Sequence, residues 1–234
     1  MSLTPKNIVV FGASGALGQA FVQLFKTHYP AAQVYPFSRQ SAQYRVDYES
    51  EQSIANAAEI AAQNGSIDLV VVATGILHTE DISPEKSLKN LSAESLTQIF
   101  QANTVTPALI AKHFLPKLNK HQPSIFAVLS ARVGSISDNR LGGWYAYRAS
   151  KAALNMLVKT ASIEMARTHK HAMVLGLHPG TVDSVLSKPF QKNVAPEKLF
   201  SAQFSVEKLW QVLQQQTPHD SGKCLAWDGQ QILP

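Results

Sequence analysis

Short apolar runs alternate with longer helical patterns along the whole of this 234-residue chain. The runs have the length of β-strands and are rich in β-branched and aromatic residues, and they cover residues 8–11, 34–37, 68–72, 125–129 and 173–177. Their apolar residues are consecutive rather than alternating, which is typical of strands that are buried on both faces of a parallel sheet. The pattern therefore predicts five strands of a buried parallel sheet.

Helical patterns fill the gaps between these runs, over residues 16–28, 51–63, 91–118, 147–167 and 206–215. Strand–helix–strand repetition at this spacing predicts an α/β fold with a doubly wound parallel sheet of the Rossmann type. No linker or internal repeat divides the chain, so we expect one domain over residues 1–234. Residues 183–205 are the least regular stretch, and they follow a strand end, where such folds place substrate loops.

The composition fits a globular protein and disfavours several classes of function. The chain is 45% hydrophobic and 16% charged, and no apolar stretch approaches the roughly 18 residues of a membrane span. The net charge of +5 is scattered rather than grouped, so nucleic-acid binding is not indicated. Cys224 is the only cysteine and the eight histidines lack metal-ligand spacing. We expect a cytoplasmic protein that binds a small molecule, without membrane, nucleic acid or metal.

A glycine-rich turn, FGASGALG at residues 11–18, follows the first predicted strand and opens the first predicted helix. Gly12, Gly15 and Gly18 permit a tight turn and let the backbone approach a bulky anion. The helix N-terminus behind them offers N–H groups and a positive dipole end. A nucleotide phosphate suits this turn; the alternative is a turn without a ligand.

The end of the second predicted strand carries Ser38 and Arg39, about where such folds read the ribose of a dinucleotide. An acidic residue there would favour NAD. A guanidinium instead makes charge-assisted, paired hydrogen bonds with the 2′-phosphate of NADP. The sequence therefore predicts NADP(H), with a solvated surface arginine as the alternative interpretation.

Tyr147 and Lys151 are the candidate catalytic pair. They are four residues apart in a predicted helix, so they share a face and their side chains can approach each other. A tyrosine has an ordinary pKa of about 10, and a nearby ammonium group lowers it by stabilising the phenolate. The pair is thus a plausible proton donor and acceptor, whereas Tyr145 has only Ala149 at the same offset.

Taken together, these motifs resemble the short-chain dehydrogenase/reductase family over essentially the whole chain. The resemblance rests on GASGALG, FSR, Asn103, a serine at a strand end, YRASK and HPG, in that order. The stretch SARVGSISDNRLGGWYAYRASKAALN and the ending LAWDGQQILP are similar to the C-factor-like branch and to the related sniffer-type carbonyl reductases. The resemblance implies an NADPH-linked reductase of an aldehyde or ketone, or a signalling protein.

The resemblance also implies roles for single residues. Tyr147 is expected to donate a proton to the carbonyl oxygen, and Lys151 to lower its pKa and hold the nicotinamide ribose. Asn103, in the predicted helix 94–118, matches the asparagine that holds a proton-relay water, and Asp47 is expected to contact adenine after the family's third strand. The other implied cofactor positions are Gly12, Ser14, Gly15, Leu17, Gly18, Ser38, Arg39, Ala73, Thr74, Gly75, Pro179, Gly180, Val182 and Ser184.

Three positions depart from the family pattern. Ala16 replaces a loop glycine, and Ala73 replaces the asparagine of an Asn-Ala-Gly motif. Ala131 stands where the family has the serine that polarises the substrate carbonyl. We expect Ser130 or Ser135 to supply that hydroxyl, although neighbouring strand residues face opposite ways. Losing one such donor typically slows a reaction by about 10²–10³-fold, so slow or lost turnover is the alternative.

Three functions compete on these residues. The first is an NADPH-dependent carbonyl reductase. The second is an NADP(H)-binding regulator with little turnover, which Ala131 favours and the intact Tyr147, Lys151 and Asn103 disfavour. The third is a sugar-nucleotide epimerase or dehydratase, which usually carries more chain after the position of Gly180. Trp144 and Tyr145 line the substrate pocket or pack in the core, and by resemblance alone we expect a homodimer or homotetramer.

Overall fold

The computed structural model describes residues 3–234, except for the side chain of residue 193. Within this part of the chain, seven strands form one sheet in the order β2-β1-β3-β4-β5-β8-β9. Neighbouring strands are parallel except for the antiparallel pair β8 and β9. The strands are β1 (Asn7–Phe11), β2 (Gln33–Phe37), β3 (Leu69–Val72), β4 (Ser124–Leu129), β5 (Ala172–His178), β8 (Cys224–Ala226) and β9 (Gln231–Ile232). The predicted doubly wound α/β fold is confirmed.

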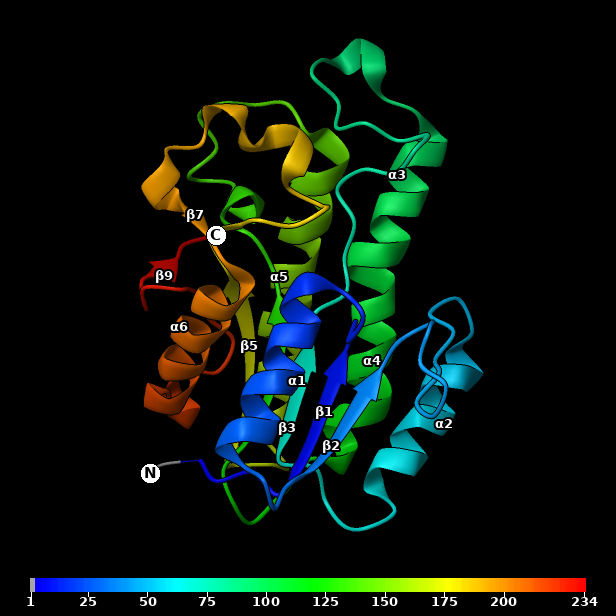
Figure 1. Ribbon diagram of the computed structural model, residues 1–234, viewed down its shortest axis with the longest axis vertical. Coiled ribbons are helices and arrows are strands. Elements are labelled where there is room, and N and C mark those ends of the chain that lie inside the picture. The colour runs from blue at the N-terminus through cyan, green and yellow to red at the C-terminus, as the bar shows by residue number, and fades with distance from the viewer. Residues whose placement is uncertain (1–2) are drawn as a thin grey trace.

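Helices cover both faces of this sheet, as Figure 1 shows. Helices α1 (Ala16–His28) and α6 (Ala202–Gln215) lie on one face, and α2 (Glu51–Ala62), α4 (Thr106–Phe114) and α5 (Tyr145–Met165) lie on the other. Strand β1 shows why both faces are apolar: Val9 and Phe11 contact the α2/α4/α5 layer, whereas Ile8 and Val10 contact the α1/α6 layer. Consecutive apolar residues in a strand therefore feed two separate cores.

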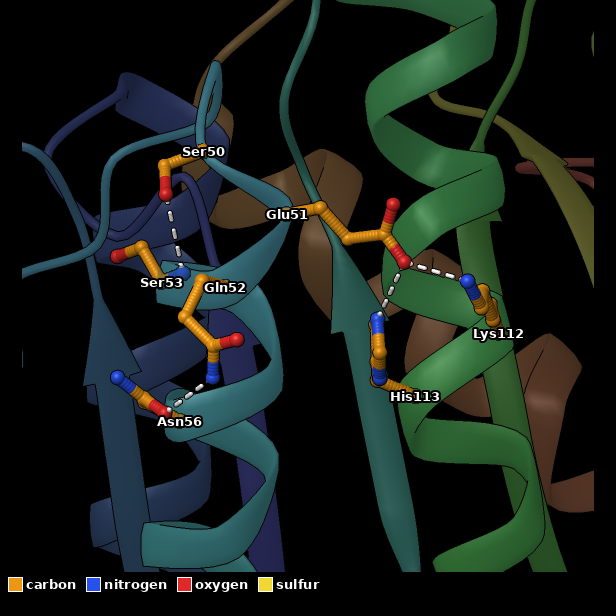
Figure 2. Close-up of polar contacts among 7 residues, drawn as sticks. All are labelled: Ser50, Glu51, Gln52, Ser53, Asn56, Lys112 and His113. Atoms are coloured by element: carbon orange, nitrogen blue, oxygen red, sulfur yellow. Dashed lines mark hydrogen bonds and ion pairs between the residues drawn. The ribbon is translucent and has the colours of Figure 1, made fainter.

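The contact between α2 and α4 includes an ion pair at the surface. The Glu51 carboxylate accepts from Lys112 Nζ and lies 3.1 Å from His113 Nε2, as Figure 2 shows. These two partners, Lys112 first, hold the pKa of Glu51 below its ordinary value. Glu51 opens α2 directly after Ser50, whose hydroxyl accepts from Ser53 N and caps the helix.

The predicted helix 91–118 is wrong as one continuous element. It consists of α3 (Ala93–Phe100), a π-helical turn over Gln101–Val105, α4, and a 3₁₀ turn over Leu115–Lys117. Pro107 lies at the start of α4, directly after the π turn, and has no N–H to donate to the preceding turn. The π turn holds Asn103, and such single turns inside helices are frequent at functional sites.

Two other segments differ from expectation. The predicted loop 183–205 contains 3₁₀ turns, the strand β7 (Leu199–Phe200), which pairs with β6 (Thr181–Val182), and the start of α6. The family's third strand is reduced to one bridge between Ser38 and Arg45. The physical reason is length, because a parallel strand beside β2 needs a crossover of about a dozen residues and only residues 39–44 separate the bridged Ser38 and Arg45.

No helix within residues 3–234 is both long enough and apolar enough to cross a membrane.

Candidate active site

The predicted site residues come together at the carboxyl ends of β1, β3, β4 and β5, at the upper end of the sheet in Figure 1. Strand β1 lies between β2 and β3, so the strand order reverses beside it. A crevice outside the strand ends at such a point is where open α/β sheets bind ligands.

The glycine-rich turn at the end of β1 has no room for side chains. Gly12 has φ +74°, and a Cβ on it would lie 2.8 Å from the Ala73 carbonyl carbon and oxygen. A Cβ on Gly18 would lie 2.1 Å from Gly12 O. Helix α1 begins behind the turn with no side-chain cap and no acidic residue in its first turn. Its first N–H groups and positive dipole end thus suit a phosphate.

Tyr48 supports this turn, and sequence reasoning did not select it. Gly12 N donates to the Tyr48 hydroxyl oxygen at 2.9 Å, and that hydroxyl donates to Phe37 O at 3.4 Å. Burial raises the pKa of Tyr48 to about 12, so the phenol is neutral at neutral pH. The residue joins the turn after β1 to the end of β2. No local pattern indicates this, because the partners are 36 and 11 residues away.

The residues after β2 are placed at the surface beside that turn. Arg39 is exposed, with no ion-pair partner among the described residues. Ser38 is buried, and its backbone bonds to Tyr44 and Val46. Asp47 is exposed, and its Oδ1 accepts from Glu49 N at 3.0 Å. Arg39 is therefore free for an anion, whereas one carboxylate oxygen of Asp47 is engaged in its own turn.

The motif after β3 provides a second close approach. A Cβ on Gly75 would lie 3.1 Å from Asn103 Oδ1 and 3.5 Å from Lys151 Nζ. Thr74 Oγ1 is buried and lacks a hydrogen-bond partner among the described atoms. The Thr74 backbone N lies 3.0 Å from where a Cβ on Gly12 would stand. An unpaired buried hydroxyl next to the glycine turn, with Arg39 and the N-terminus of α1, fits a bound dinucleotide such as NADP(H).

Tyr147 and Lys151 lie on one face of α5, as their spacing predicts. Lys151 Nζ is 5.8 Å from the centroid of the Tyr147 ring and donates to Leu129 O at 2.9 Å. Lys151 is only 3% exposed, and burial lowers its pKa to about 8. Burial raises the pKa of Tyr147 to about 12, opposite to the predicted direction. The pKa of Lys151 is itself lowered, and its ammonium group is bound to Leu129 O. The cost of desolvating the Tyr147 phenolate therefore outweighs the attraction of the Lys151 cation.

Asn103 connects the loop after β3 to α5. Its Oδ1 accepts from Ile76 N and its Nδ2 donates to Ile76 O, both at 2.8 Å. Nδ2 also lies 3.2 Å from Ser150 Oγ, and that hydroxyl donates to Tyr147 O. Asn103 is fully buried. Its side chain holds the loop and α5 together, and its expected role with a water stays a prediction.

Neither serine expected to replace the one missing at Ala131 is free. Ser130 Oγ donates to Asn155 Oδ1 at 2.6 Å. Ser135 Oγ accepts from the backbone N of Asp138 at 3.1 Å and lies near another hydroxyl. Ala131 is extended, with φ −153° and ψ 148°, and is 8% exposed. Either serine would have to exchange a protein partner for a substrate oxygen, so their assignment stays a prediction.

The segment after β5 forms the far side of the site. Gly180 has φ +76°, and a Cβ there would lie 2.6 Å from the Phe200 ring. Val182 is buried in β6, and its carbonyl accepts from Ser184 Oγ at 3.3 Å, while Pro179 O accepts from Ser205 Oγ at 2.7 Å. These contacts shape the loop, and the expected cofactor contacts of Pro179, Gly180, Val182 and Ser184 stay predictions.

His178, the last residue of β5, has an unpartnered Nδ1 among the described atoms. Burial, followed by the charge of Arg132, lowers the pKa of His178 to about 4. The ring is thus neutral at neutral pH and supplies no cation to the site.

Comparison with known proteins supports the family resemblance. Among curated proteins, the chain is 31% identical over 146 residues to C-signal of Myxococcus xanthus, covering 62% of this chain and 82% of C-signal. It is 27% identical over 187 residues, 78% of each chain, to 1-hydroxy-2-glutathionyl-2-methyl-3-butene dehydrogenase of Rhodococcus sp. strain AD45.

Solved structures share the fold over nearly the full length. Carbonyl reductase Sniffer of D. melanogaster superposes with a TM-score of 0.81 at 22% identity, covering 98% of this chain and 99% of the other. The NADPH-bound carbonyl reductase from chicken fatty liver gives a TM-score of 0.80 at 23% identity, with the same coverage. The model of the short chain dehydrogenase family matches residues 6–195, more than half of the chain. This protein therefore belongs to the short-chain dehydrogenase family, whose members are oxidoreductases that use a nicotinamide cofactor.

Proposed function

We propose that this protein is an NADPH-dependent reductase that converts an aldehyde or ketone into an alcohol, with Tyr147 as the proton donor. One observation carries the proposal: Tyr147 and Lys151 share a face of α5, and the glycine that follows β3 brings its backbone against Lys151 Nζ and Asn103. The phosphate-type turn after β1 lies at the same end of the sheet. A binding turn and a proton donor are thus found at one end of the sheet.

The residues around the crevice support NADPH as the cofactor. When bound, NADPH supplies a hydride to the carbonyl carbon. Gly12 and Gly18 keep the turn open to phosphates, and Arg39 offers an unpaired guanidinium for a 2′-phosphate. Lys151, buried beside Gly75, is in position to hold ribose hydroxyls. Solved relatives of the same fold are named as NADPH- or NADP-bound proteins.

The pKa of Tyr147 favours reduction over the reverse reaction. At about 12, it keeps the phenol protonated at neutral pH, so the proton is available when the carbonyl oxygen gains negative charge. An alkoxide is a stronger base than a phenolate, so this transfer is downhill. An oxidation would need the phenolate as a base, and burial makes that state costly.

A second function is favoured by Ala131 and by the similarity to C-signal. Without a hydroxyl at position 131, and with Ser130 bonded to Asn155, the substrate carbonyl lacks one polarising donor. A protein that binds NADP(H) and turns over slowly or not at all could act as a regulator. The neutral phenol of Tyr147 argues against this second function, because a regulator needs no proton donor.

The test compares Tyr147→Phe with Tyr145→Phe, a matched loss of one phenol hydroxyl in the same turn of α5. NADPH binding is measured by fluorescence, and NADPH oxidation is followed against aldehydes, ketones and quinones. We expect all three proteins to bind NADPH more tightly than NADH, and only Tyr147→Phe to lose turnover. Turnover that survives in Tyr147→Phe would overturn the assignment of the proton donor. Binding without turnover in the wild type would favour the regulator.

A further inference from the structure

A row of three rings from three segments of the chain begins beside Tyr147. The Trp144 ring lies 6.2 Å from the Tyr147 ring and 5.1 Å from the Phe190 ring, between centroids. The Phe190 ring lies 5.7 Å from the His78 imidazole, whose Nε2 is 3.3 Å from Val185 O. All four rings are half-buried, so each keeps some solvent-exposed surface. They form an aromatic wall (His78, Trp144, Phe190) next to the proposed proton donor.

The backbone at Trp144 is in a costly conformation. Trp144 has φ +53° and ψ 45°, and it is the only non-glycine residue among those described with a positive φ. Gly142 and Gly143, before it, are also left-handed, at +64° and +65°. A bulky side chain in this region is a genuine outlier, and such residues persist where the surroundings hold them.

Glu85 is the residue that holds this conformation. Trp144 N donates to Glu85 O at 2.5 Å, and Ala146 N donates to the Glu85 carboxylate at 3.2 Å. Glu85 is only 3% exposed, and its carboxyl group lies at the N-terminus of α5, where the helix dipole favours an acidic side chain. The start of α5 is therefore tied to the loop after β3, and the indole is fixed one turn ahead of Tyr147.

Core packing does not account for the indole. Trp144 lies outside both cores of the sheet and outside the smaller cluster of Ile82, Ile99 and Ala146. Its ring partners are the half-buried Tyr147 and Phe190, the latter on the 3₁₀ segment Lys188–Asn193. Nearby loops expose Leu141 and Val185, at 92% and 84%. Exposed apolar side chains thus flank the aromatic wall on both of these loops.

We propose that Trp144 is a specificity-determining residue that stacks on the substrate and selects carbonyls conjugated to a flat aromatic ring. This inference rests on the proposed reductase function and specifies its substrate class. At 5.1 Å, the rings of Trp144 and Phe190 leave no gap for a third ring. The substrate ring therefore takes the place of Phe190 on the indole, which sets its carbonyl beside Tyr147.

The test uses two ketones with the same carbon skeleton, acetophenone and cyclohexyl methyl ketone, of which only the first has a flat aromatic ring conjugated to its carbonyl. The variants are Trp144→Gly, which suits a positive φ and preserves the backbone N–H, Trp144→Phe, which keeps a ring, and Phe190→Ala. Binding to NADP⁺-loaded protein is measured by calorimetry, and kcat/KM is measured with NADPH. We expect a wild-type preference for acetophenone of about 2- to 12-fold, the size of one aromatic pair. The preference disappears in Trp144→Gly and persists in Trp144→Phe and Phe190→Ala.

Equal affinities for the two ketones in the wild type would overturn the inference, as would a preference that survives in Trp144→Gly or is lost only in Phe190→Ala. The binding arm separates this inference from the proposed function. If no carbonyl is reduced but acetophenone binds preferentially through Trp144, the reductase assignment fails and the stacking site stands. If both ketones are reduced with equal kcat/KM and bind equally, the reductase stands and the stacking site fails.

Discussion

Replacing Gly18 with alanine tests whether the close approach of α1 to the turn after β1 builds the cofactor site. A Cβ at this position would lie 2.1 Å from Gly12 O, 2.7 Å from Gly12 C and 2.9 Å from Ala13 Cα. All three atoms belong to the backbone of the turn, so no side chain can rotate away. The helix or the turn has to move by about 1.3 Å to restore an ordinary 3.4 Å contact.

The expected size of the effect follows from two opposing terms. Overpacking of this kind typically costs about 1–3 kcal/mol, and occasionally more. Alanine is better than glycine inside a helix by about 0.8–1 kcal/mol, which offsets part of that cost. Because the clash is with rigid backbone, we place Gly18→Ala at the upper end, with a net loss of about 2 kcal/mol in the free energy of unfolding. Displacing Gly12 should also weaken NADPH binding by at least about tenfold.

The assay is urea unfolding followed by circular dichroism, together with an NADPH titration. Gly15→Ala is the stability control, because Gly15 has an ordinary φ of −81° and its Cβ would lie 3.4 Å from Gly12 O. Gly15 is the N-cap of α1, where alanine is less favourable than glycine, and this offsets the gain from a stiffer unfolded chain, so we expect the control to lie within about 1 kcal/mol of the wild type. If Gly18→Ala unfolds at the same urea concentration as Gly15→Ala, the reasoning from the close approach is refuted.

Three further predictions concern the same end of the sheet. The pKa of His178 falls to about 4 in the folded state, so the unfolded chain binds more protons than the folded protein between about pH 4 and 6.5. The free energy of unfolding therefore rises with pH across that window by up to roughly 3 kcal/mol. Urea unfolding at pH 4.5 and 7 should show this difference, and His178→Gln should reduce it. Tyr48→Phe leaves Gly12 N without its acceptor, which should lower the free energy of unfolding by about 1–3 kcal/mol and weaken NADPH binding. A variant with wild-type stability and NADPH affinity would contradict the role of Tyr48 in supporting the glycine-rich turn. Ala131→Ser should raise kcat by about 10²–10³-fold at an unchanged NADPH Kd. An unchanged kcat would mean that another hydroxyl already serves as the donor, and a loss of kcat in Ser130→Ala or in Ser135→Ala would identify it.

The architecture and the position of the candidate site follow from local patterns along the chain. Consecutive apolar residues mark buried strands whatever their neighbours are, so the predicted run 8–11 differs from β1 by one residue at one end. The glycine turn was equally readable, because a strand end followed by glycines and a helix start is a local pattern. Four residues separate Tyr147 from Lys151, and helical geometry alone puts both on one face of α5.

The tertiary structure decided what those residues can do. Burial reversed the expected direction of the Tyr147 pKa, and burial depends on the whole surrounding fold. The Ser130 hydroxyl donates to Asn155, 25 residues along the chain, and the start of α5 donates to Glu85, 61 residues away. Sequence patterns report periodicity and local conformational preference, whereas hydrogen-bond partners and solvent exclusion at the site come from segments that only the folded sheet brings together.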